Sequence, residues 1–330
     1  MYSNKTDNQS QLFGNFVYQN VISDDHLLKK ISRAVDFSFV EQETRNFYAS
    51  VGRPGLSPTM LFKMCLISYL YDISDRRLED EINYNIVYKW FVGLDIDQKA
   101  PDHSTMTRFR DRLGEEGFRL LFNRIVEMAG AKGLINERLT IIDSTDVTAN
   151  VDVGRLKKHK RDDDDNSYVD RHSPDPDARF GRKSKSKGFY GYKDHLAIDA
   201  DSSIITAVET TPGNVPDRDV FRQLIRGHPR SVTADKGYDA EPNWSYLDAR
   251  SIQAAIIPVR RCRGRPPKPE RQRSWIERKF AELKHYHGKG RCRWLGLLKA
   301  GIQALITCAA VNLKAMASAL SSPPMVNCAL

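Results

Sequence analysis

Three acidic residues stand in sequence contexts that can bring them together in space. Asp143 and Asp235 each follow a short β-branched, apolar run, and Glu277 falls inside a helix predicted for Gln272–His285. Carboxylates from neighbouring strand ends and a crossing helix can converge on one point. Oxygen ligands of this kind suit Mg²⁺, and two ions about 4 Å apart can activate a water or hydroxyl and stabilise the leaving oxygen of a phosphoryl substitution. The pattern therefore indicates a site for two Mg²⁺ ions, with Mn²⁺ as a substitute.

The other acids near these three are expected to have different roles. Asp146 lies three residues beyond Asp143 and points to the opposite face if the strand continues. Asp239 is suited to cap a following helix. Glu282 lies five residues after Glu277, roughly 140° round a helix, so both cannot face one metal pair. The sequence thus favours one acid from each of the three segments.

The elements that must position the acids change in character along the chain. From Ser23 to about Gly130 the apolar spacing is helical, and beyond Gly133 short β-branched runs alternate with helical ones. The expected order there is strand, hairpin, helix, strand, helix, strand and two helices. We predict strands at 139–142, 189–200, 204–211, 231–234 and 252–259, helices at 216–226, 272–285 and 295–320, and a charged loop at 154–187.

This order predicts an α/β fold in which a ribonuclease-H-like mixed sheet is flanked by helices and preceded by an all-α domain. The predicted domains are a polar tail over residues 1–22, a helical DNA-binding domain over 23–132, a catalytic domain over 133–320 and a C-terminal tail over 321–330. Within 295–320, Lys299, Gln303 and Lys314 favour a core-packing helix over a membrane span.

Positive charge is concentrated in one region. The formal net charge is +9, and between Ile256 and Ala300 fourteen Lys and Arg oppose three Glu, an excess of 14 − 3 = 11. Such a field attracts polyanions and releases counterions from nucleic acid. A solvated basic face is the alternative. An anionic membrane is disfavoured because the region lacks a long amphipathic apolar face.

Two basic segments are candidates for DNA contact. A helix predicted to start at Ser104 carries Arg108, Arg110 and Arg112 and fits either a helix-turn-helix or a plain helical bundle with solvated arginines. The segment 261–269, RCRGRPPKP, resembles a minor-groove AT-hook through Arg263 and Arg265. Nonspecific phosphate contacts and a solvated linker are the alternatives for that segment.

Cysteine usage and the N-terminus indicate the compartment. The five cysteines form no CxxC pair, and the first twenty residues show no signal-peptide pattern. We expect a reducing cytoplasm, with association with the nucleoid when DNA is bound, and no membrane. Cys262, His285, His287 and Cys292 do not have the spacing of an ordinary zinc module. For His195, a structural or DNA-contacting role is favoured over catalysis.

Three blocks resemble the catalytic blocks of bacterial insertion-sequence DDE transposases of the family 4 and family 5 type. They are IIDSTDVTAN with Asp143, VTADKGYDA with Asp235, and RSWIERKFAELK with Glu277. In the third, Arg273 and Lys284 match the family's spacing, whereas Glu270 stands where the family has a tyrosine. GRPGLSP, DISDRRLEDEI and PDHSTMTRFRDRL resemble the N-terminal helical domain, and FYGYKDHLAIDADSSIITAVETTPGNVPD resembles the central hairpin.

The resemblance implies a metal-dependent transposase whose catalytic acids and metal ligands are Asp143, Asp235 and Glu277. Its partners would be double-stranded DNA, as terminal inverted repeats and as target, and a second copy of the chain in a synaptic complex. Forty-two positions separate Asp235 from Glu277, too few for the β insertion that some relatives carry there. The predicted DNA contacts are Arg108, Arg110, Arg112, Lys193, Arg263, Arg265, Arg273 and Lys284.

Two other functions remain open on the sequence alone. Glu282, Leu283 and Lys284 fit the ExK element of restriction-type nucleases, although that element normally lies on a strand and the pattern here is helical. A transposase-derived DNA-binding protein without catalysis is the second alternative.

Overall fold

The helices begin where the sequence supplies N-caps. The computed structural model describes residues 8–49, 55–158, 165–182, 188–258 and 273–321, which form two compact units, Met1–Leu134 with Ala309–Leu330 and Ile135–Cys308. Ser57 caps α4 and is followed by Pro58 at the first helical position, and Ser74 caps α5. The long helix α7 is capped by Asp102, so it begins at His103, one residue before the predicted start.

The first unit is helical. Its elements are α1 (Asn8–Val21), α2 (Leu27–Ala34), α3 (Phe39–Thr44), η1 (Arg45–Phe47), α4 (Pro58–Leu70), α5 (Asp75–Tyr84), α6 (Ile86–Val92) and α7 (His103–Ala131). The helix α7 is interrupted at Gly114, whose φ of 57° is not helical. α12 (Leu297–Ser321) belongs to the second unit up to Cys308 and to the first from Ala309.

The segment 8–21 is helical where a polar tail was predicted. Its sequence is polar, but Tyr18 is buried and its hydroxyl donates a hydrogen bond of 2.8 Å to the carbonyl of Leu94. The helix therefore depends on a contact 76 residues away in the chain, which local periodicity does not reveal.

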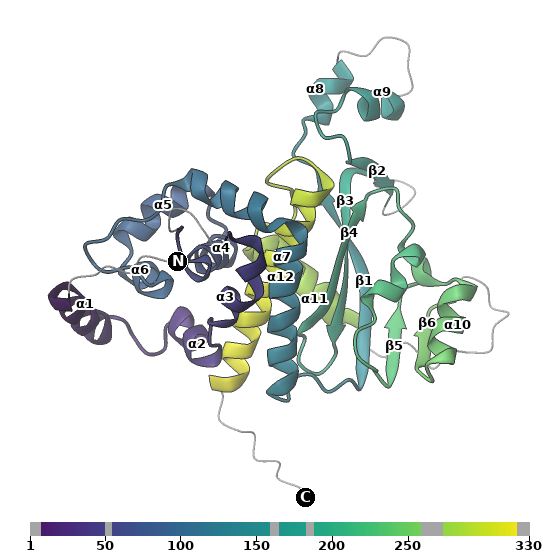
Figure 1. Cartoon of the computed structure of the whole chain (residues 1–330). Coiled ribbons are helices and arrows are strands. Elements are labelled where there is room, and N and C mark those ends of the chain that lie inside the picture. The colour runs from purple at the N-terminus through teal and green to yellow at the C-terminus, as the bar shows by residue number, and fades with distance from the viewer. Residues whose placement is uncertain (1–7, 50–54, 159–164, 183–187, 259–272, 322–330) are drawn as a thin grey trace, which may run out of the picture. The chain divides into compact units, whose positions relative to one another are not determined.

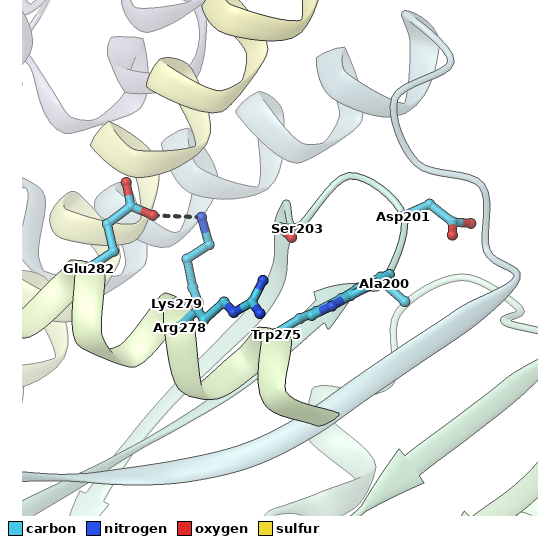
Figure 2. Close-up of a pocket in the computed structure, with 7 residues that line it drawn as sticks. All are labelled: Ala200, Asp201, Ser203, Trp275, Arg278, Lys279 and Glu282. Carbon is cyan, nitrogen blue, oxygen red and sulfur yellow. Dashed lines mark hydrogen bonds and ion pairs between the residues drawn. The ribbon is translucent and has the colours of Figure 1, made fainter. Parts of the chain in front are cut away.

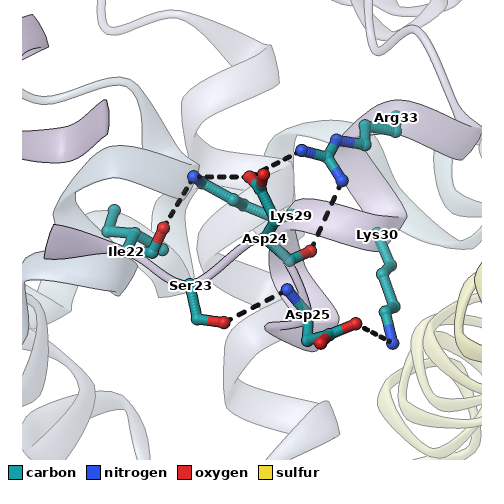
Figure 3. Close-up of polar contacts among 7 residues, drawn as sticks. All are labelled: Ile22, Ser23, Asp24, Asp25, Lys29, Lys30 and Arg33. Atoms are coloured by element: carbon teal, nitrogen blue, oxygen red, sulfur yellow. Dashed lines mark hydrogen bonds and ion pairs between the residues drawn. The ribbon is translucent and has the colours of Figure 1, made fainter. Parts of the chain in front are cut away.

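A charged network joins α2 to the segment that precedes it (Figure 3). Asp24 pairs with Lys29 at 3.1 Å and with Arg33 at 2.6 Å, and the Lys29 ammonium also donates to the carbonyl of Ile22 at 2.7 Å. Lys30 pairs with Asp25 at 3.3 Å. The hydrogen bond from Lys29 and its charge, together with Arg33, lower the pKa of Asp24. All three cations of α2 therefore have acidic partners in the preceding turn.

The second unit is built on a mixed sheet. Its strands are β1 (Leu139–Thr148), β2 (Arg179–Arg182), β3 (Gly188–Asp199), β4 (Ile205–Pro212), β5 (Ser231–Ala234) and β6 (Gln253–Ile256). β1 lies between β3, which is antiparallel to it, and β5, which is parallel to it, and β6 continues parallel to β5. β4 and β2 pair antiparallel with successive stretches of β3. The predicted ribonuclease-H-like fold, with a mixed sheet flanked by helices, is confirmed.

The second unit also contains helices and short turns. They are α8 (Val153–Lys158), α9 (Asp165–His172), η2 (Asp217–Asp219), η3 (Phe221–Leu224), η4 (Lys236–Tyr238), α10 (Glu241–Ala249) and α11 (Arg273–Tyr286). Figure 1 shows α10 beside β6, where Leu247 and Ile256 share a core with Phe221, Val232 and Ala234. α11 contacts β1.

Three predicted elements of this unit differ clearly from the observed ones. The first strand was predicted to end at Ile142, but β1 runs on to Thr148 because β3 pairs with it over that whole stretch, so Asp143 lies inside the strand. Residues 154–187 were predicted to be a loop, yet α8, α9 and β2 form there because Val169 and Ala178 are buried in a second core with Tyr190 and Tyr192. Residues 216–226 were predicted to be one helix. They form the 3-10 turns η2 and η3, and Asn243 holds the carbonyl of Arg218 by a 3.0 Å hydrogen bond from its side chain.

Among the described residues, one helix, α12, is long and apolar enough to cross a membrane by length and composition alone. Of its most apolar 18-residue window, 67% is buried inside the protein. Gln303 is fully buried and its amide donates to the carbonyl of Arg291 at 3.0 Å while accepting from Arg293 at 2.9 Å. These contacts are those of a helix packed in a protein core.

Candidate active site

Asp143 and Asp235 follow directly on paired residues of parallel strands. Ile142 of β1 and Ala234 of β5 are register partners, and both are fully buried. β5 ends at Ala234, so Asp235 leaves the sheet beside Asp143 and caps η4 by accepting from the backbone N–H of Lys236 at 2.7 Å. The parallel register therefore places the two residues next to each other, at the point where β5 ends and β1 continues.

The third predicted acid, Glu277, borders the same space. A pocket of about 470 Å³ is lined by Asp143, Asp235 and Glu277 together. The remaining lining residues are Ser144, Thr145, Asp146, Arg182, Phe189, Lys193, Asp217, Phe280, Ala281 and Lys284. All belong to the second unit, and we refer to this space as the acidic pocket.

One face of α11 forms a wall of the acidic pocket. Glu277, Phe280, Ala281 and Lys284 are spaced at i, i+3, i+4 and i+7, which is one stripe of an α-helix. Glu282 lies outside this stripe and lines a different pocket. The predicted separation of Glu277 from Glu282 is thus confirmed. Because Glu282 and Lys284 face different pockets on a helix, the ExK alternative has no support.

Both lysines of the acidic pocket are paired with acids outside the predicted triad. Lys193 pairs with Asp217, and Lys284 lies 3.1 Å from Asp146. The residues that line the acidic pocket include five carboxylates and three cations, so their formal net charge is 3 − 5 = −2. A net negative pocket of oxygen ligands suits divalent cations.

Asp146 lines the acidic pocket, contrary to the prediction that it points away. The reason lies in the pairing of β1. β5 accompanies β1 only as far as Ile142, whereas β3 accompanies it to Thr148. Beyond Ile142 one edge of β1 therefore has no strand beside it among the described residues, and side chains from both faces can border the pocket there.

A buried hydrogen-bond chain supports the floor of the site. His195 is fully buried, with Nδ1 3.2 Å from the Tyr238 hydroxyl and Nε2 3.0 Å from the Thr211 hydroxyl. Burial lowers the pKa of His195 to about 4. Burial also raises the pKa of Tyr238, and the carboxylates of Asp217 and Asp143 raise it further. The structural role favoured for His195 agrees with these contacts.

Asp217 and Ser144 were missed by the sequence predictions. The Ser144 hydroxyl donates to Asp217 at 2.9 Å, and Asp217 also accepts from Lys193. Asp217 closes the TTPGNVPD block, where two prolines and a glycine before an acid indicate a turn that fixes a side chain. The sequence therefore indicates that Asp217 lies in a rigid turn. It does not identify Ser144, 73 residues earlier, as the hydrogen-bond partner.

Asp239 was predicted to cap the following helix, but that cap position is Ala240. Asp239 instead accepts a hydrogen bond of 2.8 Å from the indole N–H of Trp244, and it is absent from the lining of the acidic pocket.

The predicted arginine contacts of α7 have different surroundings. Arg110 is buried and its guanidinium binds Asp75 of α5, so it joins two helices. The Arg112 guanidinium lies over the Tyr48 ring, 4.7 Å from its centre. Arg108 is exposed, with one contact of 3.3 Å to Ser104. Of the three, Arg110 is thus held in the protein interior.

The other predicted contacts lie at the limits of the described residues. Arg263 and Arg265, with the AT-hook segment and Cys262 of the zinc alternative, lie outside them. Arg273 is the first residue of α11, and its side chain is likewise not described.

Another group of possible metal ligands, separate from the acidic pocket, lies in the first unit. Ligand atoms of Glu79, Asp102 and His103 all lie within 4.8 Å of one another, the one such group among the described residues. Asp102 accepts from the backbone N–H of Ser104 at 2.8 Å, and Glu79 accepts from that of His103 at 2.8 Å. These bonds explain the group as the capped start of α7.

Asp143, Asp235 and Glu277 are less tightly grouped than those three residues. A single small ion needs its ligands close together, whereas a pair of ions about 4 Å apart spans a wider set. The three carboxylates nevertheless border one pocket, from within β1, from the end of β5 and from α11.

The sheet order and the acid-lined pocket define a ribonuclease-H-like protein. Residues 136–313 match the family described as Transposase DDE domain, and residues 16–112 match that described as Transposase domain (DUF772). The first match covers more than half of the 330 residues. The chain therefore belongs to the DDE transposase family. The predicted family is confirmed, and the family 4 or family 5 subtype stays a prediction.

Two solved structures are similar to the chain at low identity. A piggyBac transposase synaptic complex with hairpin DNA matches at 12% identity and a TM-score of 0.31, covering 76% of this chain. This chain spans 53% of that protein's length. A pre-cleavage Mos1 transpososome matches at 10% identity and a TM-score of 0.20, covering 97% of this chain and 99% of that one.

Proposed function

We propose that the chain is a DNA transposase that cuts the ends of an insertion-sequence element and joins the exposed 3′ hydroxyls to target DNA. The observation that carries this proposal is the shared acidic pocket, which Asp143 borders from within β1, Asp235 from the end of β5 and Glu277 from α11. Membership of the DDE transposase family supports it independently.

Asp143, Asp235 and Glu277 would hold two divalent cations, Mg²⁺ or Mn²⁺. When bound, the ions activate the attacking oxygen and stabilise the leaving one in an in-line substitution at phosphorus. Hydrolysis and strand transfer are both substitutions of this kind, so one set of residues can serve both steps.

The cations of the acidic pocket would bind the DNA backbone. Lys284 and Glu277 lie on one stripe of α11, so the ammonium group can bind a phosphate oxygen beside the acids. Lys193 and Arg182 border the same pocket. Asp217 orients Lys193 and Ser144 through direct hydrogen bonds.

We further propose that the helical unit binds the terminal inverted repeats, with Arg108 and Arg112 of α7 contacting DNA. Two ends must be held together for joining, so two chains would assemble on them in the bacterial cytoplasm. Exposure of Arg108 supports a phosphate contact.

The test is cleavage of a plasmid carrying the DNA that flanks the gene on both sides. We expect metal-dependent breaks with 3′ hydroxyls in Mg²⁺. Asp143→Asn, Asp235→Asn and Glu277→Gln should each lower the rate by at least roughly 100-fold while DNA binding persists, because several kcal/mol of charge stabilisation is lost. Asp248→Asn, an exposed acid of α10, is the matched control. Full cleavage by any of the three variants would overturn the assignment.

A further inference from the structure

The face of α11 directed away from the acidic pocket borders a second pocket. This space of about 340 Å³ is lined by Ala200, Asp201 and Ser203 at the β3–β4 turn and by Trp275, Arg278, Lys279 and Glu282 of α11 (Figure 2). Pockets that bind small ligands start at roughly this volume. We call it the tryptophan pocket.

The two pockets share one helix. Trp275, Arg278, Lys279 and Glu282 repeat the i, i+3, i+4, i+7 spacing of the acidic stripe, displaced by two residues. At 3.6 residues per turn, this displacement is about 200°, so the stripes lie on opposite sides of α11. The helix is roughly 10–12 Å wide with its side chains, so a strand that passes halfway round it from one pocket to the other covers roughly 16–19 Å.

Ion pairs within the tryptophan pocket leave one exposed cation. Lys279 lies 2.9 Å from Glu282, and Asp201 is paired with Arg138 at 2.8 Å. Figure 2 shows the Lys279–Glu282 contact, and it shows the Asp201 carboxylate turned away from α11. Arg278 is exposed, and no ion pair involves it within the described part of the chain. The charge that remains available is therefore positive.

The indole and the guanidinium suit one ligand chemistry. Trp275 is half-buried and projects from α11 on the same side as Arg278 (Figure 2). A flat aromatic ring can stack on any of the four nucleobases, and the guanidinium group of an arginine can bind a phosphate through two hydrogen bonds. α11 also lies in the segment with a local charge excess of +11, counted from Ile256 to Ala300 (14 − 3), which attracts polyanions.

We propose that the tryptophan pocket binds one unpaired nucleotide of a DNA strand, with the base on Trp275 and the phosphate on Arg278. This inference rests on the proposed function, because the strand would pass round α11 from the acidic pocket. A strand cut in the acidic pocket supplies such an unpaired end. The site would then distinguish an opened DNA end from continuous duplex.

The test compares two fluorescent probes on the full chain in EDTA, where cleavage is impossible. One probe is a blunt 30-base-pair duplex, and the other is the same duplex with a five-nucleotide thymidine tail. We expect the wild type to prefer the tailed probe. Trp275→Ala should weaken binding of the tailed probe by roughly tenfold, since stacking of one base contributes about 1–3 kcal/mol. Binding of the blunt probe should stay within about twofold.

Further variants separate stacking from folding. Trp275→Phe should keep most of the preference because it keeps an aromatic face, and Arg278→Gln should lose part of it. Arg226→Gln, an exposed arginine outside both pockets, should change neither probe. With 5-iodouracil in the tail, photocrosslinking should label the peptide that contains Trp275.

Three outcomes would overturn the inference. They are an unchanged preference in Trp275→Ala and Arg278→Gln, equal weakening of both probes, and loss of self-association in sedimentation without loss of the tail preference. The last outcome would assign the pocket to a second copy of the chain. Cleavage assays in Mg²⁺ are separate, so failure of the proposed activity leaves the binding result interpretable.

Discussion

Ile142 and Ala234 are register partners in parallel strands, and each is followed directly by an acid of the proposed triad. This pairing fixes the position of Asp143 relative to Asp235 through backbone hydrogen bonds, with no need for a contact between the two side chains. Glu277 joins them from α11. The relative positions of the three acids thus depend on the register of β1 with β5 and on the face of α11 that carries Glu277.

The contact between Lys284 and Asp146 predicts a measurable salt dependence. If Lys284 binds a phosphate, Lys284→Gln should reduce the slope of log Kd against log salt concentration by about 0.9, the contribution of one neutralised phosphate of duplex DNA. Both side chains of this ion pair are about a quarter exposed, so loss of the pair should change the free energy of unfolding little. Lys299→Gln, an exposed lysine of α12, is the control. An unchanged slope for Lys284→Gln would exclude the phosphate contact.

Arg110 and Arg108 should give opposite results in parallel assays. Arg110→Ala leaves the partly buried Asp75 without its partner and should lower the melting temperature by roughly 6–12 °C, corresponding to about 3 kcal/mol. Arg108→Ala should leave the melting temperature unchanged and weaken DNA binding. Scanning calorimetry and a binding titration would check both. Equal melting temperatures for the two variants would contradict the assigned roles.

His195 should make stability depend on pH. Its pKa is lowered by burial from 6.5 to about 4, so between these values the unfolded chain binds a proton that the native protein does not. Stability must therefore fall as the pH drops through this window. We expect the free energy of unfolding to be about 2 kcal/mol lower at pH 5 than at pH 7.5 from this group.

Urea denaturation of the full chain at both pH values would check this expectation. His195→Gln has no imidazole to protonate, so it should show a smaller difference between pH 5 and pH 7.5 than the wild type. Equal differences in the two proteins would show that another group is responsible.

The sequence predicted the elements whose signals are local. β5 was predicted with its observed bounds because a short apolar run is followed by Asp235, Lys236 and Gly237, and the β3–β4 hairpin followed from two apolar runs around a polar turn. The stripe of Glu277 and Lys284 followed from helical periodicity. These features depend on residues close together in the chain.

The features that the sequence did not predict depend on distant contacts. The inclusion of Asp146 in the pocket follows from the point at which β5 stops, and the position of Asp217 in η2 follows from its contacts with Ser144 of β1 and Lys193 of β3. The burial of Arg110 depends on Asp75, 35 residues earlier. Local patterns specify which residue types are present but not which distant partner neutralises them.

Asp143, Asp235 and Glu277 are proposed to hold two divalent ions. Mn²⁺ titration of the DNA-bound chain, followed by electron paramagnetic resonance, measures this directly. We predict two bound Mn²⁺ per chain with a spin-coupled signal, and loss of that coupling in Asp143→Asn, Asp235→Asn and Glu277→Gln. Two coupled ions in all three variants, at wild-type affinity, would contradict the account.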